Sequence, residues 1–401
     1  MPQAILALNA GSSSIKFAAY RVGTGSELTL ACKGSLDRHA REAKLIVKDA
    51  ASTVLQEHTS ESVDSSSALT TLLLGRIEPL LGDAELAAVG HRVVHGGPTF
   101  SAPVLVDSAV LQALDALTPL APLHQPGCLD PIRSLISVRP RLLQVACFDT
   151  AFHHDLPPTY RRFPLPAEFE ADGIRRYGFH GLSFEYIARS LDSVEARVVV
   201  AHLGSGSSLC AIRNGKSVNT TMSLTPLDGL MMATRSGAID PGLVLYLQQT
   251  KNMSASEIEE LLYHRSGLIG LSGISSDMRI LLASDDLKAK EAIDQFCACV
   301  AEQIAAMATC MSGVDLLVFT GGIGENSPEI RKQICARLNW LGLRIDDEAN
   351  MRGHNSISTR ESRFAVRVIP TDEESVIAMQ TRDIIDRANL EDPNRIAKNP
   401  A

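Results

Sequence analysis

A glycine-rich turn follows a short apolar run at three places along the chain. The turns begin at Gly11, Gly204 and Gly321, and the run before each of them is typical of a buried strand. Backbone N–H groups that gather at a glycine turn can bind a phosphate, because no side chain blocks its approach. A single turn of this kind usually only reverses the chain, but three of them favour a protein that binds a phosphorylated ligand.

The spacing of these turns also bears on domain organisation. The first two have the same layout, an apolar strand, a turn and a return strand, and they lie nearly half the chain apart. A chain of 401 residues is too long for one compact core. We therefore expect an α/β protein with two similarly built domains, each with a mixed central sheet, and a cleft between them. The domains should cover residues 1–150 and 151–386, with a polar tail from 387 to 401 and with the last helix free to pack on the first domain.

Helical patterns connect the strands. Apolar residues at helical spacing predict helices over 108–117, 183–191 and, most clearly, 287–311. The segment 254–257 matches a capping box, and the segment 213–215 has the composition of a hairpin turn. Strands that alternate with helices in this way support the α/β class.

Composition and charge exclude several classes of protein. The formal net charge of −8 argues against a nucleic-acid partner, and it requires any anion site to be locally basic. No stretch approaches the roughly 20 apolar residues of a membrane span, and no basic cluster precedes the N-terminal apolar run as in a signal peptide. Eight scattered cysteines fit reduced thiols, since Cys297 and Cys299 have neither a zinc nor a thioredoxin spacing. We therefore expect a cytoplasmic protein.

Hydroxyl groups accompany two of the turns, in the run 12–14 and in the pair Ser207 and Ser208. We expect them to add donors to phosphate oxygens. No turn has the Gly-Lys-Ser/Thr ending of a Walker loop, and no G-x-G-x-x-G opens a first helix with an acid after the second strand. P-loop and Rossmann nucleotide sites are therefore disfavoured.

Charged residues near these elements are candidates for a site. Arg92 and Arg235 lie beside small residues, and a guanidinium fork suits a carboxylate or a phosphate, although a lone arginine is more often a surface ion-pair partner. Asp149 ends an apolar strand, where open sheets place ligands. Glu373 and Glu374 open a helix, where acids also serve as caps. Because Mg²⁺ takes only one or two carboxylates, this small set of acids is sufficient for a magnesium site.

Three histidines complete the candidates. His124, His180 and His202 have no shared metal spacing, so a zinc site is disfavoured. Imidazoles that donate to a phosphoryl oxygen fit their positions better.

Taken together, these segments resemble the acetate kinase family, within the superfamily of acetate and sugar kinases, actin and heat-shock chaperones. The similarity runs from Asn9 to about Arg382. The motifs that carry it are Asn-Ala-Gly-Ser-Ser-Ser-x-Lys-Phe at 9–17, Phe-Asp-Thr-Ala-Phe-His at 148–153, Arg-Tyr-Gly-Phe-His-Gly at 176–181 and Gly-Gly-Ile-Gly-Glu-Asn at 321–326.

The resemblance implies two actin-like domains, as in a ribonuclease H-like duplication, the second of which binds the nucleotide. It implies reversible phosphoryl transfer between ATP and acetate, giving acetyl phosphate and ADP. Mg²⁺ would be the cofactor, with Mn²⁺ as an alternative, and the protein would be a homodimer without nucleic-acid or membrane partners. We expect direct in-line transfer without a phosphoenzyme. Alternatives are a propionate kinase and, less favoured, a sugar kinase of the same superfamily.

The resemblance also assigns roles in catalysis. Arg92 would bind the acyl carboxylate or its phosphate, and Asp149 occupies the acid-or-base position of the family. His180 and Arg235 would stabilise the transferring phosphoryl group, with His124 nearby. A carboxylate acceptor is already ionised at pH 7, so no base is needed to activate it. We therefore expect Asp149 to position metal or water, or to orient Arg235, and keep proton transfer as the alternative.

The resemblance assigns ligand contacts as well. Asn9 and Glu373 would hold Mg²⁺, and a small apolar pocket for the acyl methyl group would be lined by Val94, Leu123, Phe179 and Pro226. The implied nucleotide contacts are Ser12, Ser14, Lys16, His202, Leu203, Gly204, Ser205, Gly206, Asp277, Met278, Arg279, Gly321, Gly322, Ile323, Gly324 and Glu325.

The sequence departs from the usual family pattern at four positions. Ser205 replaces an asparagine in the second turn, and Gln125 replaces an asparagine after His124. Leu182 and Phe184 replace a threonine and a histidine after His180, which removes polar groups next to the expected transfer site. We expect ATP binding to survive, since Ser205 can still donate one hydrogen bond.

Overall fold

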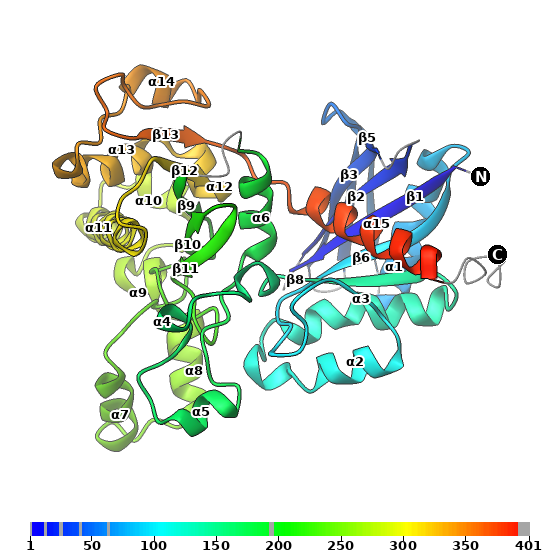
Figure 1. Cartoon of the computed structure of the whole chain (residues 1–401), viewed down its shortest axis with the longest axis horizontal. Helices are drawn as coiled ribbons and strands as arrows, with labels where there is room; N and C mark the ends of the chain where they lie inside the picture. The colour runs from blue at the N-terminus through cyan, green and yellow to red at the C-terminus, as the bar shows by residue number, and fades with distance from the viewer. Residues whose placement is uncertain are drawn as a thin grey trace. The chain divides into compact units, whose positions relative to one another are not determined.

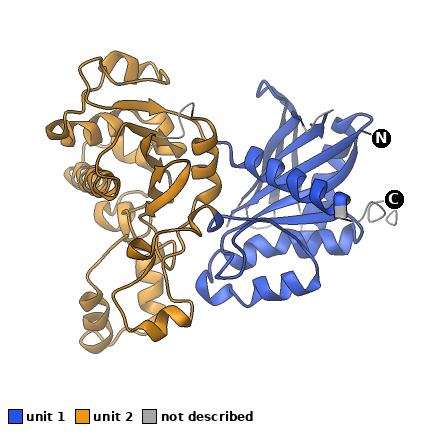
Figure 2. Cartoon of the chain, in the orientation of Figure 1, with its two compact units in different colours: residues 1–151, 372–401 blue, residues 152–371 orange. Residues whose placement is uncertain are grey.

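The structure is a computed structural model. It describes residues 2–11, 14–23, 27–39, 42–61, 65–191 and 196–391. The chain forms two compact units, which Figure 2 shows in separate colours. Unit 1 contains residues 1–151 and 372–401, and unit 2 contains residues 152–371.

Unit 1 is built on an eight-stranded mixed sheet with the order β5-β4-β3-β2-β1-β6-β8-β7 (Figure 1). Strands β1, β6 and β8 run parallel, and the other neighbours pair antiparallel. The carboxyl ends of β1, β6 and β8 therefore meet at one edge of the sheet. The strands are β1 Gln3–Ala10, β2 Ser14–Val22, β3 Leu28–His39, β4 Glu42–Lys48, β5 Val54–Glu61, β6 Glu85–Val93, β7 Val104–Leu105 and β8 Leu143–Phe148.

Helices cover both faces of this sheet. Val89 on β6 belongs to the buried cluster that contains residues of α1 and α3, whereas the neighbouring Gly90 faces α15. Successive residues of a strand point to opposite faces, so α15 lies on the face away from α1 and α3. The helices of unit 1 are α1 Ser66–Ile77, α2 Ser108–Asp115, α3 Gln125–Val138 and α15 Glu373–Glu391.

Helix α15 packs on the first unit, an arrangement that the sequence left open. The range expected for the second domain, 151–386, includes residues 372–386, but these lie in unit 1, where α15 packs on β1, β6 and β8. Its residues Val376, Ile377 and Ala378 are fully buried, and this apolar face determines where the helix packs. The helix continues to Glu391, past the expected start of the tail at 387, and residues 392–401 lie outside the described ranges.

Unit 2 contains a five-stranded mixed sheet with the order β11-β10-β9-β12-β13. Strands β9, β12 and β13 run parallel, and β9, β10 and β11 form an antiparallel meander. The strands are β9 Arg197–Leu203, β10 Ser207–Arg213, β11 Lys216–Thr220, β12 Leu316–Thr320 and β13 Ala365–Val368. The same succession of three antiparallel and two parallel strands occurs in unit 1 as β3-β2-β1-β6-β8, so the expectation of two similarly built halves is correct.

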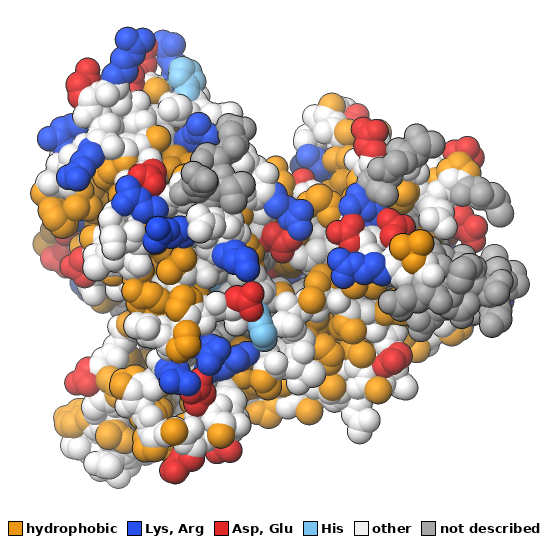
Figure 3. Space-filling model, in the orientation of Figure 1, with side chains coloured by type: hydrophobic (Ala, Val, Ile, Leu, Met, Phe, Trp, Pro, Cys, Tyr) orange, Lys and Arg blue, Asp and Glu red, His pale blue; other side chains and the backbone are white. Residues whose placement is uncertain are grey.

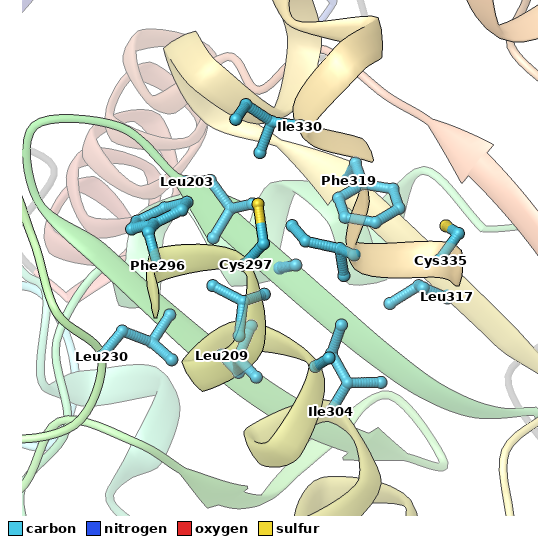
Figure 4. Close-up of a cluster of buried hydrophobic side chains, with 14 of the residues drawn as sticks. Leu203, Leu209, Leu230, Phe296, Cys297, Ile304, Leu317, Phe319, Ile330 and Cys335 are labelled. Atoms are coloured by element: carbon cyan, nitrogen blue, oxygen red, sulfur yellow. The ribbon is translucent and has the colours of Figure 1, made fainter. Parts of the chain in front are cut away.

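The core of unit 2 lies between the sheet and α11. Phe296, Cys297 and Ile304 on this helix pack against Leu209 on β10 and Phe319 on β12 (Figure 4). The opposite face of the sheet is covered by α6, whose side chains cluster with β9, β10 and β12. The helices of unit 2 are α4 Pro158–Arg161, α5 Ala167–Ala171, α6 Gly181–Arg189, α7 Pro241–Gln249, α8 Ala255–His264, α9 Gly267–Ser272, α10 Met278–Leu282, α11 Leu287–Cys310, α12 Gly321–Asn326, α13 Pro328–Arg337 and α14 Asp347–Met351.

The local predictions agree with the structure to within a few residues. Helices α2 and α11 begin at the expected residues, whereas α6 begins at Gly181, two positions before its predicted start. The capping box of α8 is present between Ser254 and Glu257. Asn214 and Gly215 both have positive φ angles, as a tight hairpin turn requires.

Two expectations concern the chain as a whole. Disulfides link none of the eight cysteines, all of which fall within the described ranges. In the part of the chain that the structure describes, every helix is too short or too polar to cross a bilayer. Basic and acidic side chains are interspersed on the face drawn in Figure 3.

The close approach of α15 to the sheet at Gly90 leads to a stability prediction. A Cβ atom on Gly90 would lie 2.1 Å from Thr381 Oγ1 and 2.6 Å from Ile377 Cγ2, so Gly90→Ala should destabilise the protein by about 1–3 kcal/mol through overpacking. Gly75→Ala is the matched control, because Gly75 lies in α1 with no atom within 4 Å of its Cβ position. It should stabilise by about 0.5–1 kcal/mol, since alanine is the better helix former. The measurement is the Tm of both variants, and equal shifts would contradict the packing described for α15.

Candidate active site

The carboxyl edge of the parallel strands in unit 1 holds a buried ion pair. Arg92 lies near the end of β6, and Asp149 directly follows β8. Arg92 Nε and Nη2 both donate to Asp149 Oδ2, at 3.0 and 2.6 Å. A third donor, Nη1, reaches the carbonyl oxygen of Ala10 at the end of β1, at 3.3 Å. Three neighbouring strand ends thus hold one guanidinium group.

The ion pair is strongly desolvated. The Asp149 side chain is 1% exposed and that of Arg92 is 18% exposed. Burial raises the pKa of Asp149 to about 6, against the opposing effect of the Arg92 charge, and the nearby Glu373 carboxylate raises it further. Burial also opposes the charge of Arg92, but the Asp149 carboxylate holds the pKa of Arg92 above its ordinary value. Both groups are therefore charged at pH 7.

The contacts of Arg92 leave part of its fork available. A guanidinium has five N–H donors, and the three contacts above use one from each nitrogen. One N–H on Nη1 and one on Nη2 remain, which is the pair that a carboxylate or phosphate can accept side by side. Arg92 can therefore bind an anion with these two donors while Asp149 holds the guanidinium group in place. The expectation that Asp149 orients Arg235 concerns a residue of unit 2 and stays a prediction; within unit 1, Asp149 holds Arg92.

A cluster of oxygen atoms lies at the end of β1. Asn9 Nδ2 donates to Glu373 Oε2 at 2.8 Å and to Glu374 Oε1 at 3.0 Å, both from the first turn of α15. Burial raises the pKa of Glu374, and the adjacent Glu373 carboxylate adds to this effect. Two carboxylates that share one amide thus carry excess negative charge, and their hard oxygen atoms suit Mg²⁺. Glu374, which the family resemblance did not assign to the metal, is thus a member of this cluster beside Glu373.

The other groups of unit 1 expected near the phosphates are only partly described. Ser14 and Lys16 begin β2, and Lys16 lies opposite Asn9 in the β1–β2 ladder with its side chain exposed. The Gly11 N–H donates to the Ser14 carbonyl at 2.8 Å, which closes the turn. Ser12 lies outside the described residues.

The segment after β6 carries Val94, which is 3% exposed. Gln125, fully buried at the start of α3, accepts from the His95 N–H and donates to the His95 carbonyl, both at 3.1 Å. Thr150 Oγ1 accepts from the Gly96 N–H at 3.0 Å. The Gln125 amide therefore has a structural role, because it fixes the backbone of His95 next to Val94. His124 immediately precedes this helix as its N-cap.

Two glycine turns meet at the carboxyl ends of β9 and β12 in unit 2. Gly321 has a φ of +77°, and a Cβ atom there would lie 2.8 Å from the Leu203 carbonyl oxygen. A Cβ on Gly204 would lie 3.3 Å from the Gly206 carbonyl oxygen and 3.8 Å from the Gly322 nitrogen. The turns at 204–206 and 321–322 therefore lie side by side, and Gly321 is required by both its conformation and its space.

The two hydroxyls of the second turn are bonded within unit 2. Ser207 and Ser208 are both fully buried. Ser207 Oγ accepts from the Gly204 N–H at 3.2 Å and donates to the Gly204 carbonyl at 3.1 Å, so it shapes the turn. Ser208 Oγ lies 2.8 Å from His180 Nδ1. Both hydroxyls are therefore bonded within unit 2, and their expected donation to phosphate oxygens stays a prediction.

Two imidazoles stack beside this turn. The rings of His180 and His202 are 4.4 Å apart with an angle of 21° between their planes. His202 Nδ1 lies 2.8 Å from Ser183 Oγ, so each ring is paired with a serine hydroxyl. His180 has a φ of +57°, a left-handed conformation that costs a non-glycine residue about 1–2 kcal/mol. A Cβ on Gly206 would lie 3.3 Å from His180 Nε2, so this nitrogen faces the turn.

The residues at 182 and 184 are apolar and fully buried on α6. The Phe184 ring contacts His202 edge-on, with ring centres 6.4 Å apart. Phe184 thus supports the His202 imidazole from the core of unit 2.

Arg235 lies in a loop held against the second turn. The Ala233 N–H donates to the Ser205 carbonyl at 3.2 Å, and a Cβ on Gly206 would lie 3.8 Å from Arg235 Nη1. Arg235 Nη1 also donates to the Pro226 carbonyl at 3.2 Å. His180 and Arg235 therefore approach the same glycine, as their predicted joint role requires.

The remaining nucleotide candidates differ in exposure. Glu325 Oε1 accepts from the N–H groups of Gly321 at 2.8 Å and Thr371 at 3.1 Å, so this carboxylate ties α12 to the segment after β13. Gly322, Ile323 and Gly324 lie in the same helix. Asp277 caps α10, Met278 is buried, and the Arg279 guanidinium is 89% exposed and bonded to Asp277 Oδ2 at 2.5 Å. This hydrogen bond from Arg279 lowers the pKa of Asp277 to about 2.

Arg331 is a structural residue that the sequence did not reveal. It is 1% exposed and donates to the carbonyl oxygens of Gly324 and Glu325 and to Asn350. These bonds satisfy the last carbonyls of α12 and fix the helix that begins at the third glycine turn.

The predicted acyl pocket draws on both units. Val94 and Leu123, which is 39% exposed, belong to unit 1, whereas the buried Phe179 and Pro226 belong to unit 2. The pocket remains a prediction.

Comparison with known proteins identifies the family. A model of the acetokinase family matches residues 4–379. The chain belongs to the acetokinase family.

Relatives within this family cover nearly the whole chain. The acetate kinase of Rhodopseudomonas palustris is 48% identical over 389 residues, which is 94% of this chain and 97% of that protein. The acetate kinase of Methylocella silvestris is 47% identical over 96% of this chain and 99% of its own length. A propionate kinase structure from Francisella tularensis aligns with a TM-score of 0.87 and 38% identity, covering 95% of this chain and all of that one. The acetate kinase of Porphyromonas gingivalis aligns with a TM-score of 0.83 and 33% identity, covering 96% of this chain and all of that one.

The buried ion pair of this acetokinase leads to a second prediction. Asp149→Asn would leave the Arg92 charge without a counter-ion, which should lower the free energy of unfolding by about 3 kcal/mol. This is the lower end of the usual range, since Arg92 keeps 18% exposure. Asp115→Asn is the control, because Asp115 and its partner Arg133 are 45% and 42% exposed. This substitution should lower the free energy of unfolding by about 1 kcal/mol at most. Equal losses of Tm in the two variants would contradict the importance of burial at Asp149.

Proposed function

We propose that this chain transfers a phosphoryl group reversibly between ATP and acetate, giving acetyl phosphate and ADP. The observation that carries the proposal is the Arg92 fork, which Asp149 holds while two N–H donors remain available. A small carboxylate has two oxygens that match this pair of donors, as a phosphate also has. The names of the relatives support the same substrate class.

The geometry around Asp149 favours positioning over proton transfer. A carboxylate substrate has a pKa near 4–5, so it is a nucleophile at pH 7 without a base. Asp149 Oδ2 already accepts two hydrogen bonds from Arg92, and the side chain is 1% exposed. We therefore assign Asp149 the role of orienting Arg92.

Unit 2 supplies the groups suited to the nucleotide and to the transferring phosphoryl group. The adjacent turns at 204–206 and 321–322 offer backbone close to a phosphate without side-chain obstruction. His180 and Arg235 approach Gly206, where they would stabilise negative charge on the phosphoryl oxygens. The fixed positions of these donors support direct in-line transfer without a phosphoenzyme.

Mg²⁺ fits the oxygen cluster at the end of β1. Asn9, Glu373 and Glu374 would hold it, directly or through its waters, and in the described ranges no denser group of acids, histidines or cysteines competes for it. When bound, the ion would neutralise charge on the nucleotide phosphates. Mn²⁺ has similar ligand preferences and is an alternative.

Propionate is a second candidate acceptor. The structural relative from Francisella tularensis is named a propionate kinase. One methylene in an apolar pocket changes specificity by only about 1–3 kcal/mol, so a modest shift of the pocket wall decides between the two acids.

We also propose that the protein is a cytoplasmic homodimer, as the family resemblance implies. Helix α7 supports a second copy as partner, because Leu243, Leu245 and Tyr246 are 42%, 53% and 47% exposed on it. Sedimentation of the full chain as a monomer would contradict the dimer.

A hydroxamate assay tests the function directly. Purified protein with Mg²⁺-ATP is incubated with acetate, propionate or butyrate and hydroxylamine, and acyl hydroxamate is measured by its colour with iron. Reactions with glycerol or with no acceptor, followed by ADP release, distinguish a sugar kinase and an ATPase. We expect acetate to give the highest kcat/KM. Absence of hydroxamate with all three acids would refute the proposal.

Substitution of the two arginines should affect different kinetic constants. Arg92→Ala should raise the KM for acetate roughly 10- to 100-fold, because a charged hydrogen bond contributes about 1.5–3 kcal/mol. Arg235→Ala should chiefly lower kcat, by roughly 100- to 1000-fold, if it stabilises the transition state. Initial rates with varied acetate at saturating ATP measure both effects. Near-normal constants in both variants would show that the site is assigned wrongly.

A further inference from the structure

His153 lies in the Phe148–His153 motif, but the function proposed above gives it no role. Its side chain is 1% exposed in unit 2. His153 Nε2 lies 3.0 Å from the Phe179 carbonyl oxygen, and Nδ1 lies 2.8 Å from Ser217 Oγ. The imidazole therefore connects β11 to the residue that precedes His180.

The direction of both hydrogen bonds of the His153 imidazole can be deduced. A carbonyl oxygen only accepts, so His153 Nε2 carries the proton and donates to Phe179. Burial lowers the pKa of His153 to about 4, so the ring is neutral at pH 7 and Nδ1 accepts from the Ser217 hydroxyl. Cys210 Sγ lies 3.3 Å from Ser217 Oγ and donates to the Ala211 carbonyl at 3.6 Å, so it packs against the hydroxyl that faces His153. The chain of bonds fixes one tautomer of His153 and one orientation of its ring.

The segment 178–180 lies directly on this ring. Gly178 has a φ of +76°, and a Cβ atom there would lie 2.6 Å from His153 Cδ2 and 2.7 Å from Thr220 Cγ2. The Tyr177 and Gly178 N–H groups both donate to the Ser223 carbonyl. His180 follows in a left-handed conformation that needs support from its surroundings.

We propose that His153 is a positioning residue, which holds the Phe179–His180 backbone so that His180 Nε2 faces Gly206 and Phe179 keeps the conformation that the predicted acyl pocket requires. His153 holds this backbone through its hydrogen bond to the Phe179 carbonyl and through its contact with Gly178. This inference rests on the proposed function, in which His180 acts on the transferring phosphoryl group. His153 itself touches no substrate.

Two substitutions separate the hydrogen bond from the volume of the ring. His153→Phe keeps an aromatic ring beside Phe152 and Phe184, which the imidazole contacts edge-on at 5.7 and 5.6 Å, but it has no donor for Phe179. His153→Gln keeps an N–H donor near the position of Nε2. Ile304→Ala is the control, because Ile304 is fully buried on α11 and its loss lowers stability away from the motif.

The kinetic expectation follows from misplacement of His180 and Phe179. His153→Phe should lower kcat roughly 10- to 100-fold with little change in the KM for ATP, and it should raise the propionate-to-acetate ratio of kcat/KM. His153→Gln should recover most of the kcat. Ile304→Ala should lower Tm while the kinetic constants of the folded enzyme stay normal.

A second measurement does not require activity. In protein with ¹³C-labelled histidine, the Cα resonance of His180 reports its backbone conformation and should move in His153→Phe but not in Ile304→Ala. If wild type forms no acyl phosphate, the proposed function fails, and this resonance still tests the contact. If His153→Phe lowers Tm but leaves kcat, the substrate ratio and the resonance unchanged, His153 only fills the core and the inference is overturned. If His153→Phe does not fold, the same readouts in Ser217→Ala, which removes the donor to Nδ1, decide the question.

Discussion

A guanidinium group that must bind an anion cannot be buried alone. The free energy lost when its charge is removed from water exceeds the free energy gained from its attraction to the anion. In unit 1 the carboxylate of Asp149 solves this problem by accepting from two nitrogens of Arg92. The arrangement depends on three parallel strands that end at the same edge, since β1 supplies the Ala10 carbonyl, β6 the arginine and β8 the aspartate. Helix α15 adds two acids to the same edge through Asn9. The edge thus alternates in charge, with a cation held by one acid and an acid pair beside it.

Unit 2 brings together imidazoles, backbone dipoles and one guanidinium. Its imidazoles are each paired with a serine hydroxyl, as in His180 with Ser208 and His202 with Ser183. The glycine turns contribute backbone dipoles, and Arg235 supplies the charge near Gly206. Dipoles that are already oriented stabilise an anion without any reorganisation of the protein. This kind of stabilisation is usually the largest contribution to the transfer of a charged group such as a phosphoryl group. This difference between the units fits the two substrates. The phosphate chain of a nucleotide needs many hydrogen-bond donors, whereas a small carboxylate needs one guanidinium group.

The sequence predicted strand ends well and long-range packing poorly. Asp149, Gly204 and Gly321 could be placed because each follows an apolar run, and the end of such a run is a local signal. Helix α15 could be recognised, but not assigned to a unit. A buried face shows that a helix packs without showing against what, and its partner Gly90 lies almost 300 residues away in the chain. The roles of Ser207, Ser208 and Gln125 were missed for the same reason. A polar side chain in a pattern looks the same whether it faces a ligand or satisfies a buried backbone group.

The repeated sheet explains why chemistry so different arises at equivalent places. The strand order β3-β2-β1-β6-β8 in unit 1 corresponds to β11-β10-β9-β12-β13 in unit 2. The turn after β1 and the turn after β9 therefore occupy the same place in the two sheets, and each follows a polar residue, Asn9 in one and His202 in the other. In unit 1 the residue that the next parallel strand brings to this edge is charged, Arg92, and demands a counter-ion. In unit 2 the next strand, β12, places the uncharged Thr320 opposite His202, and Gly321 directly follows it. The place that a guanidinium occupies in unit 1 thus leads in unit 2 into a glycine turn, whose backbone no side chain obstructs.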